Sequence, residues 1–219
     1  MQQYIPILQK SALFHDVSEA NLLGMLHCLL AKVKTYDKNT YIIHATQSPL
    51  DVGIVLSGRA NIISEDYWGN RNILTTLEPG ELFGEAFACA QAKLNSFNVI
   101  AAEKSKIMFI NYAKITTPCQ RACSFHTKII QNMLQLVSQK NIMLTTKIEH
   151  LTKKTTREKL LSYLSNEAIK KHSHTFSIPF NRQELADFLS VERSAMSAEL
   201  SRMQKDKLIS YHKNQFTLL

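Results

Sequence analysis

The sequence has no long hydrophobic run and few cysteines. None of its segments approaches the roughly 18 consecutive apolar residues of a membrane-spanning helix. Its first residues lack the basic segment, apolar run and small-residue cleavage site of a secretory signal. Its four cysteines are too widely spread to form the disulfide framework of a small secreted domain. These absences predict a cytoplasmic protein with no membrane partner.

Positive charge is abundant but unevenly distributed. The 219 residues carry a net charge of +8. Residues 152–219 hold twelve Lys and Arg against seven Asp and Glu, whereas residues 1–151 hold fourteen against eleven. The excess in the C-terminal third favours a polyanionic partner there, although charge alone predicts only non-specific attraction.

Residues 124–151 contain no Gly or Pro and have apolar residues at helical spacing, which predicts one long helix. At 1.5 Å per residue this helix is about 42 Å long, enough to connect two domains. One stripe alternates steps of four and three, as in the seam of a coiled coil. Its members are Ile130, Leu134, Val137, Asn141, Leu144, Ile148 and Leu151. A polar Asn at a seam position fixes register at some cost in stability, so Asn141 favours a homodimer.

A second apolar stripe lies on an adjoining face of the same helix and consists of Ile129, Met133, Leu136 and Met143. We expect this stripe to pack on the helix's own domain while the seam meets a second copy of the chain. The alternative is a core helix that is buried within a single domain.

From residue 33 to residue 110 the pattern changes to short β-rich runs separated by turn residues. The runs are residues 41–43, 53–56, 60–63, 73–77, 97–101 and 106–110. Short strands at this spacing predict an antiparallel sandwich or barrel.

Residues 180–209 have the pattern of two short helices joined by a turn. Asn181 and Glu184 form a capping box at the start of the first helix. The second helix has an inward face of Met196, Leu200 and Met203. Residues 209–219 follow as two strands, so the whole segment reads as a helix-turn-helix with a hairpin wing.

Residues 52–87 resemble the β-roll of the cyclic-AMP receptor protein / fumarate-nitrate regulator (CRP/FNR) family of bacterial transcription regulators. The resemblance is carried by Gly58, Gly69, Asn70, Pro79, Gly80, Phe83, Gly84 and Glu85. Residues 180–209 align without a gap with the DNA-binding unit of the same family.

The resemblance implies an α+β chain in three parts. Residues 1–123 would form an effector-sensing domain, an N-terminal double-stranded β-helix that is the cyclic-nucleotide-binding-like β-roll. Residues 124–151 would be the dimerisation helix, and residues 152–219 the winged helix-turn-helix DNA-binding domain. Such a protein is a homodimeric regulator rather than an enzyme. We expect its partners to be double-stranded DNA, RNA polymerase and an unidentified small-molecule effector.

In this family the second helix of the motif lies in the major groove, and its first residues read base edges. The resemblance therefore implies that Arg193 donates to guanine O6 and N7. Ser194 and Ser197 stand where further base or phosphate contacts occur. Ala198 stands where the family often has Arg, so the operator should differ.

Three further residues are expected to contact the DNA backbone. Arg182 and Gln183 resemble backbone-contacting positions at the start of the first helix. Arg202, on the outward face of the second helix, is a further candidate for a phosphate contact. The alternative is a winged helix that serves protein contacts.

The effector pocket departs from the family pattern. In cyclic-nucleotide-binding relatives, Gly84 and Glu85 would open a short helix that faces the phosphate, with Glu85 bonding the ribose. The Arg-Ser pair that neutralises the phosphate falls here at Asn95 and Ser96, so the cation is missing. A buried phosphate without its counter-ion has a high desolvation cost, which helix amides offset only in part.

The adenine-capping Thr-Ser pair of the cyclic-AMP receptor falls here at Leu144 and Thr145, so one of the two partners is also changed. Cyclic AMP is therefore not the expected effector, and Glu85 is expected to persist as a structural turn residue.

The family also includes redox and haem sensors, so an alternative function is a haem, iron–sulfur or other small-ligand sensor in which DNA binding is secondary. Cys119 and Cys123 form a CxxxC pair before the long helix, although buried apolar thiols explain them as well. No histidine stands out as an axial ligand among His15, His27, His44 and His126. No nucleophile–base pair or metal-ligand spacing indicates catalysis.

We predict no calorimetric binding of cyclic AMP at micromolar concentrations, because Asn95 cannot neutralise its phosphate. Asn95→Arg, which restores the family residue, is expected to create weak affinity. Tight binding of cyclic AMP by the unaltered protein would contradict this interpretation of the pocket.

Overall fold

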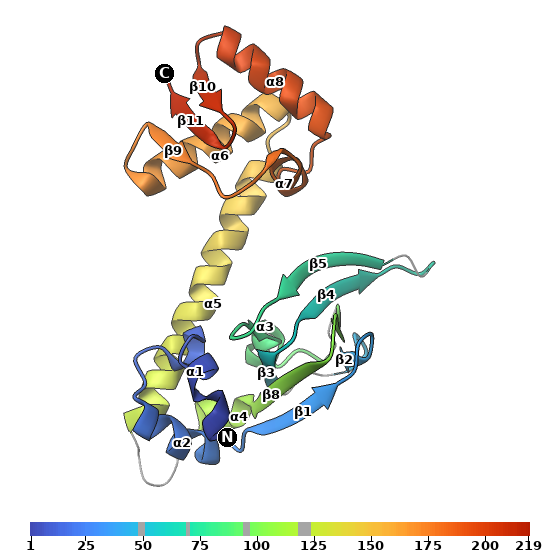
Figure 1. Ribbon diagram of the computed structural model, residues 1–219, viewed down its shortest axis with the longest axis vertical. Helices are drawn as coiled ribbons and strands as arrows, with labels where there is room; N and C mark the ends of the chain where they lie inside the picture. The colour runs from blue at the N-terminus through green and yellow to red at the C-terminus, as the bar shows by residue number, and fades with distance from the viewer. Residues whose placement is uncertain (48–50, 69–70, 94–96, 118–123) are drawn as a thin grey trace. The chain divides into compact units, whose positions relative to one another are not determined.

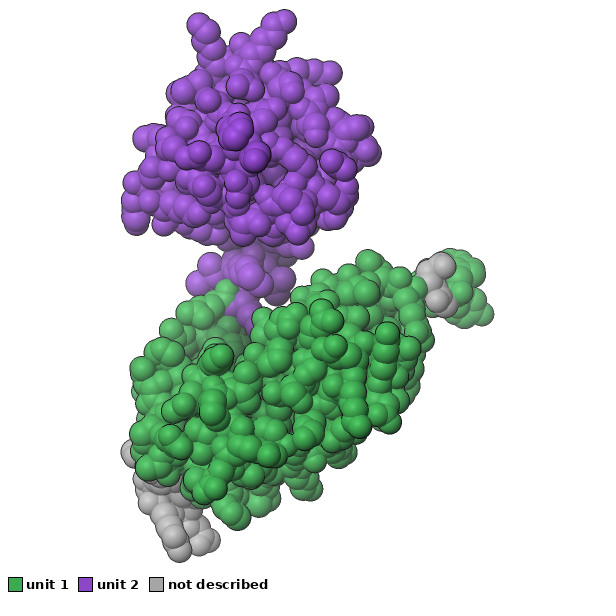
Figure 2. Space-filling view, viewed as in Figure 1, with its two compact units in different colours: residues 1–139 green, residues 140–219 purple. Residues whose placement is uncertain are grey.

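The computed structural model describes residues 1–47, 51–68, 71–93, 97–117 and 124–219. Within these ranges the chain forms two compact units, residues 1–139 and residues 140–219 (Figure 2). Six residues singled out from the sequence lie outside the described ranges, namely Gly69, Asn70, Asn95, Ser96, Cys119 and Cys123. Across the described part of the chain, no helix combines the length and the apolar character needed to span a bilayer.

The first unit combines short helices with two antiparallel sheets (Figure 1). Its helices are η1 (Gln2–Tyr4), α1 (Ile5–Leu8), η2 (Ala12–Phe14), α2 (Glu19–Cys28), α3 (Glu85–Cys89), α4 (Tyr112–Thr116) and the start of α5 (Ser124–Leu151). Its strands are β1 (Lys32–Tyr36), β2 (Tyr41–Ile43), β3 (Asp51–Ser57), β4 (Ala60–Glu65), β5 (Arg71–Leu77), β6 (Leu82–Phe83), β7 (Asn98–Ala101) and β8 (Ser105–Asn111).

The strands form two four-stranded sheets in the orders β1-β8-β3-β6 and β2-β7-β4-β5. Every expected β-rich run became a strand, which confirms the antiparallel architecture. Strands β1 and β6 were not singled out, because β1 alternates charged residues and β6 has only two residues. Each sheet takes strands from both ends of the β segment, so the chain crosses repeatedly between the two layers.

Apolar side chains from both sheets fill the space between them. This cluster includes Ile43 of β2, Val55 of β3, Phe83 of β6 and Val99 of β7. A Cβ at Gly53 would overlap the ring of Phe83, so only glycine permits the phenyl ring to lie against β3.

A second core joins the outer face of the first sheet to the N-terminal helices and to α5. It includes Ile54 and Met108 from the sheet, Leu22 from α2, and Ile129 and Met133 from α5. The expected packing of the second apolar stripe on its own domain is therefore confirmed for this part of the helix.

Two residues of α5 depart from the rule that its apolar residues are buried and its polar residues exposed. Asn132 is buried, and its side-chain amide donates to the carbonyl oxygens of Leu13 and His15 at 2.9 and 2.8 Å. These bonds fix the N-terminal segment on the helix. Met143 was expected to be buried with the stripe, but it is 62% exposed, because the helix has left the first unit at that point.

The second unit contains the end of α5 and a small α+β domain (Figure 1). Its further elements are α6 (Thr156–Lys171), β9 (Thr175–Ser177), α7 (Arg182–Phe188), α8 (Arg193–Lys205), β10 (Ile209–His212) and β11 (Gln215–Leu218). The strands form one antiparallel sheet in the order β10-β11-β9. The expected ranges of the long helix, the two short helices and the hairpin are confirmed to within a few residues.

Candidate nucleic-acid interface and effector domain

Helices α7 and α8 form a helix-turn-helix with well-defined ends. Asn181 and Glu184 make both hydrogen bonds of the expected capping box, at 3.0 and 2.7 Å. The turn between the helices is held from a third helix, since Lys159 of α6 donates to the carbonyl oxygens of Leu189 and Ser190 at 3.1 and 3.4 Å. No local sequence pattern identifies this lysine, because its contact with Leu189 links residues 30 positions apart.

Helix α8 has one buried and one exposed face. Met196, Leu200 and Met203 are fully buried, as expected from their spacing. Arg193, the first residue of the helix, is exposed. The core therefore holds α8 with its first turn and outer face open to a partner.

The other predicted contact residues of the motif make hydrogen bonds within the chain. The hydroxyl group of Ser194 donates to Glu192, and that of Ser197 donates to the carbonyl oxygen of Arg193 at 2.9 Å. The amide group of Gln183 donates to Asp187 at 2.8 Å. The two hydroxyl oxygens can still accept a hydrogen bond, but their donor atoms are engaged.

Arg182 lies against the wing. Its guanidinium carbon is 4.8 Å from the ring centre of Tyr211 and 5.2 Å from that of Phe216. Partial burial lowers the pKa of this side chain, while Tyr211 opposes the shift. Stacking on two aromatic rings attaches the start of α7 to the β10–β11 hairpin. Its role as a DNA-backbone contact stays a prediction.

Arg202 belongs to an ionic cluster that connects α6 with α8. Glu199 accepts from Arg157 Nε at 2.5 Å and from Arg202 Nη1 at 3.1 Å, and Arg157 also pairs with Asp206 at 2.8 Å. Only 9% of Glu199 is exposed. Hydrogen bonding from Arg157, followed by the other interactions with the two arginines, holds the pKa of this carboxyl below its ordinary value. The cluster fixes the recognition-type helix on α6 and leaves the Arg202 side chain 69% exposed.

The last turn of α5 is joined to α6 by a histidine. His150 is buried, its Nδ1 lies 2.7 Å from the hydroxyl oxygen of Ser162, and its ring meets that of Tyr163 edge to face. Burial lowers the pKa of this imidazole. This contact helps to make the end of α5 part of the same compact unit as the helix-turn-helix.

In the β-roll, Gly84 and Glu85 open helix α3 as expected. Gly84 has a φ of +79°, and a Cβ there would lie 3.3 Å from the carbonyl oxygen of Asp51. Both the backbone conformation and the close contact therefore favour glycine at this position. Glu85 is 5% exposed and begins the helix. The neighbouring phosphate-site positions, Asn95 and Ser96, lie outside the described residues.

Comparisons with known proteins match both units. Residues 33–121 match the cyclic nucleotide-binding domain family, and residues 158–219 match the Crp-like helix-turn-helix domain family. The chain is 22% identical over 190 residues to the cAMP-activated global transcriptional regulator CRP of Pasteurella multocida, covering 85% of this chain and 88% of that protein. The protein of the same name from Haemophilus influenzae is 21% identical over 199 residues, covering 86% and 83%. The chain belongs to the CRP/FNR family of transcription regulators.

Solved structures of this fold cover nearly the whole chain. A CooA variant from Carboxydothermus hydrogenoformans aligns with a TM-score of 0.54 and 18% identity, over 94% of this chain and 88% of that one. The c-di-GMP responsive global regulator CLP of Xanthomonas campestris aligns with a TM-score of 0.52 and 18% identity, over 90% and 98%. These likenesses show the β-roll and winged-helix fold.

Membership of the CRP/FNR family establishes the broad function. The protein is a transcription regulator with an effector-binding domain and a helix-turn-helix domain that binds DNA, and members of this family are not enzymes. The predictions of fold, family and regulatory function are thereby confirmed.

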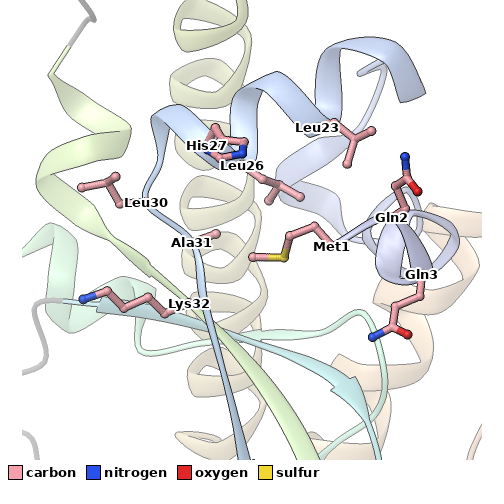
Figure 3. Close-up of a pocket in the computed structure, with 9 residues that line it drawn as sticks. All are labelled: Met1, Gln2, Gln3, Leu23, Leu26, His27, Leu30, Ala31 and Lys32. Carbon is pink, nitrogen blue, oxygen red and sulfur yellow. The ribbon is translucent and has the colours of Figure 1, made fainter.

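The remaining effector-pocket candidates, Leu144 and Thr145, are exposed on the part of α5 that belongs to the second unit. An open cavity of about 950 Å³ lies elsewhere in the first unit, beside α2 (Figure 3). It is lined by Met1, Gln2, Gln3, Leu23, Leu26, His27, Leu30, Ala31 and Lys32. None of these residues belongs to the expected effector pocket.

Neither cysteine within the described ranges forms a disulfide bond. Cys28 is exposed, and Cys89 is partly buried with a thiol pKa raised chiefly by burial. Within the described ranges, no group of three or more His, Cys, Asp or Glu residues could hold a metal ion. Cys119 and Cys123 lie outside those ranges.

The Arg157–Glu199 contact leaves a partial signal in the sequence. Glu199 falls between Met196, Leu200 and Met203 at helical spacing, so it lies on the buried face of α8. A carboxylate on a buried face requires a partner. Such a pattern can show that a cation is needed, but it cannot identify Arg157, which is 42 residues away.

We predict that Glu199→Gln lowers the free energy of unfolding by about 1–3 kcal/mol at pH 7, because charge-assisted bonds to two arginines are lost. The folded-state pKa of Glu199 is below its ordinary value of 4.5, so the charged form stabilises the fold above pH 4.5. This contribution declines as the pH falls through the lowered pKa. The difference in the free energy of unfolding between the variant and the wild type should therefore shrink in that pH range. Urea unfolding across that pH range measures it.

Glu167→Gln is the matched control. Its side chain is also 12% exposed, but among the described residues its ion pair is with the exposed Lys170, one turn away on α6. We expect this substitution to change the free energy of unfolding by less than about 0.5 kcal/mol. Equal losses in the two variants would contradict a special role for the arginine cluster.

Proposed function

We propose that the protein is a homodimeric bacterial transcription regulator that binds an inverted-repeat operator in response to a small-molecule effector. Residues 1–123 would sense the effector, residues 124–151 would dimerise, and residues 152–219 would bind DNA. The observation that carries this proposal is the geometry of α8, whose inner face is fully buried while Arg193 and its first turn are exposed. Such a protein would act in the cytoplasm, and RNA polymerase would be a further partner.

The apolar seam of α5 supports the dimer. Leu134, Leu144 and Ile148 are 68%, 54% and 59% exposed. Asn141 is exposed between them, and Ile130, Val137 and Leu151 are partly buried. A row of exposed large apolar side chains marks a protein interface, and a single polar residue within the row suits a paired helix.

The effector is proposed to be a ligand other than cyclic AMP. The curated relatives are described as cAMP-activated, and CLP as responsive to c-di-GMP, so family membership leaves the ligand open. The missing cation at Asn95 argues against cyclic AMP. The effector would act by shifting a pre-existing equilibrium between arrangements of the two DNA-binding domains.

We predict that replacing both Leu144 and Ile148 with Lys gives monomers in sedimentation experiments, because two buried charges would face the partner helix. The matched control replaces Gln139 and Ile142 with Lys on the outer face of the same helix and should stay dimeric. Asn141→Val should keep or raise association while loosening register. A dimeric Leu144/Ile148 variant would show that the interface lies elsewhere.

We predict that the operator is an inverted repeat with half-sites about one helical turn, roughly 34 Å, apart. Arg193→Ala should cost about 1–3 kcal/mol per half-site and relax the preference at one base pair. Arg202→Ala should weaken binding to all sequences alike, and it should flatten the salt dependence by about one unit for each phosphate that the variant no longer neutralises.

The two variants are distinguished by affinities for a selected operator and for random duplex at two salt concentrations. If Arg193→Ala lowers both affinities equally, Arg193 is a backbone contact, and the bases must be read by Ser194, Ser197 or Gln183.

A further inference from the structure

Glu192 is the N-cap of α8, and its carboxylate is held in one orientation. The Oε2 atom accepts from the backbone N–H of Ala195 at 2.8 Å and from the hydroxyl group of Ser194. These hydrogen bonds keep the pKa of Glu192 below its ordinary value. The side chain is exposed and remains charged at neutral pH. The first turn of the recognition-type helix therefore presents a fixed negative charge beside Arg193.

The carboxylate of Glu192 can accept a further hydrogen bond. The backbone N–H of Ser194 also donates to this carboxylate, but a carboxylate has about four lone-pair sites, so three hydrogen bonds leave it able to accept another. The exposed N-cap of this helix therefore retains acceptor capacity toward a partner. The backbone N–H that an uncapped helix end could offer to a DNA phosphate is already occupied by the carboxylate, so this helix end is a poor phosphate site.

A carboxylate near DNA is repelled by the phosphates, unless it receives a hydrogen bond from a base. In the major groove cytosine itself presents only the N4 amino donor, and the neighbouring acceptor, O6, belongs to the paired guanine. Adenine offers N6 but places the N7 acceptor next to it, while guanine and thymine present acceptors. Cytosine is therefore the base whose hydrogen bond best offsets the repulsion between a carboxylate and the phosphates.

We propose that Glu192 reads a cytosine in each half-site by accepting a hydrogen bond from its N4 amino group. The cytosine lies within one base pair of the guanine read by Arg193, because the two residues are adjacent at the end of the helix. Ser194 is then a positioning residue, because the hydrogen bond from its hydroxyl group holds the Glu192 carboxylate in place. This inference rests on the proposed operator binding by α8.

The test is selection of operators from a random duplex library, followed by affinity measurements on single-base variants. For the wild type we expect cytosine within one base pair of the position that Arg193→Ala relaxes. Glu192→Ser keeps a favoured N-cap residue and removes the carboxylate. It should reduce the preference for cytosine by about tenfold per half-site and raise affinity for random duplex, with the guanine preference retained.

Two further variants sharpen the result. Glu192→Gln keeps the length of the side chain and adds a donor, so its preference should move toward adenine, whose N6 and N7 fit an amide. Glu149→Gln removes one negative charge from the end of α5, outside the two helices of the motif, and should leave base preferences unchanged. Thermal unfolding followed by circular dichroism checks that each variant is folded.

The outcomes separate this inference from the function on which it rests. If the wild type selects no operator, both fail. If it selects an operator but Glu192→Ser retains the full cytosine preference, Glu192 only caps the helix and the inference alone is wrong. The same holds if no cytosine lies within one base pair of the guanine.

Discussion

Helix α5 has two adjoining apolar faces, and burial of one of them organises the first unit. Ile129 and Met133 pack among the N-terminal helices and the outer face of a β-sheet, and Asn132 fixes the N-terminal segment through two carbonyl groups. Buried apolar area of this kind supplies most of the stability of a packed helix. The first unit covers this face, whereas Leu134, Leu144 and Ile148 on the adjoining face stay exposed.

The DNA-binding unit depends on a different kind of interaction. Its apolar core sets the spacing of the helices, but charged groups determine how α8 is held. Glu199 receives two arginines, and Lys159 holds the turn before α8. Buried or half-buried ionic contacts of this type are costly to break, because one partner is then left without its counter-charge. They fix the helix while its outer face stays polar and open.

Several polar residues of this unit have a structural role in the free protein in addition to any DNA contact. Arg182 stacks on the wing aromatics, and Ser194 donates to Glu192. By contrast, Arg193 is exposed at the start of α8, beside the exposed carboxylate of Glu192. Glu192 and Arg193 therefore form an adjacent pair of opposite charges that is open to a partner.

The sequence by itself determined the elements and the family, because these depend on local patterns. Helical periodicity over residues 124–151, the capping box at Asn181 and the order of turn glycines are all properties of neighbouring residues. Only the tertiary structure decided which polar groups meet. Arg157 reaches Glu199 across 42 residues, and Asn132 reaches Leu13 across 119, distances in sequence over which no periodicity operates. Even between near neighbours, the orientation of the Glu192 carboxylate depends on how the first turn of α8 is placed by the core, which no spacing of residues expresses.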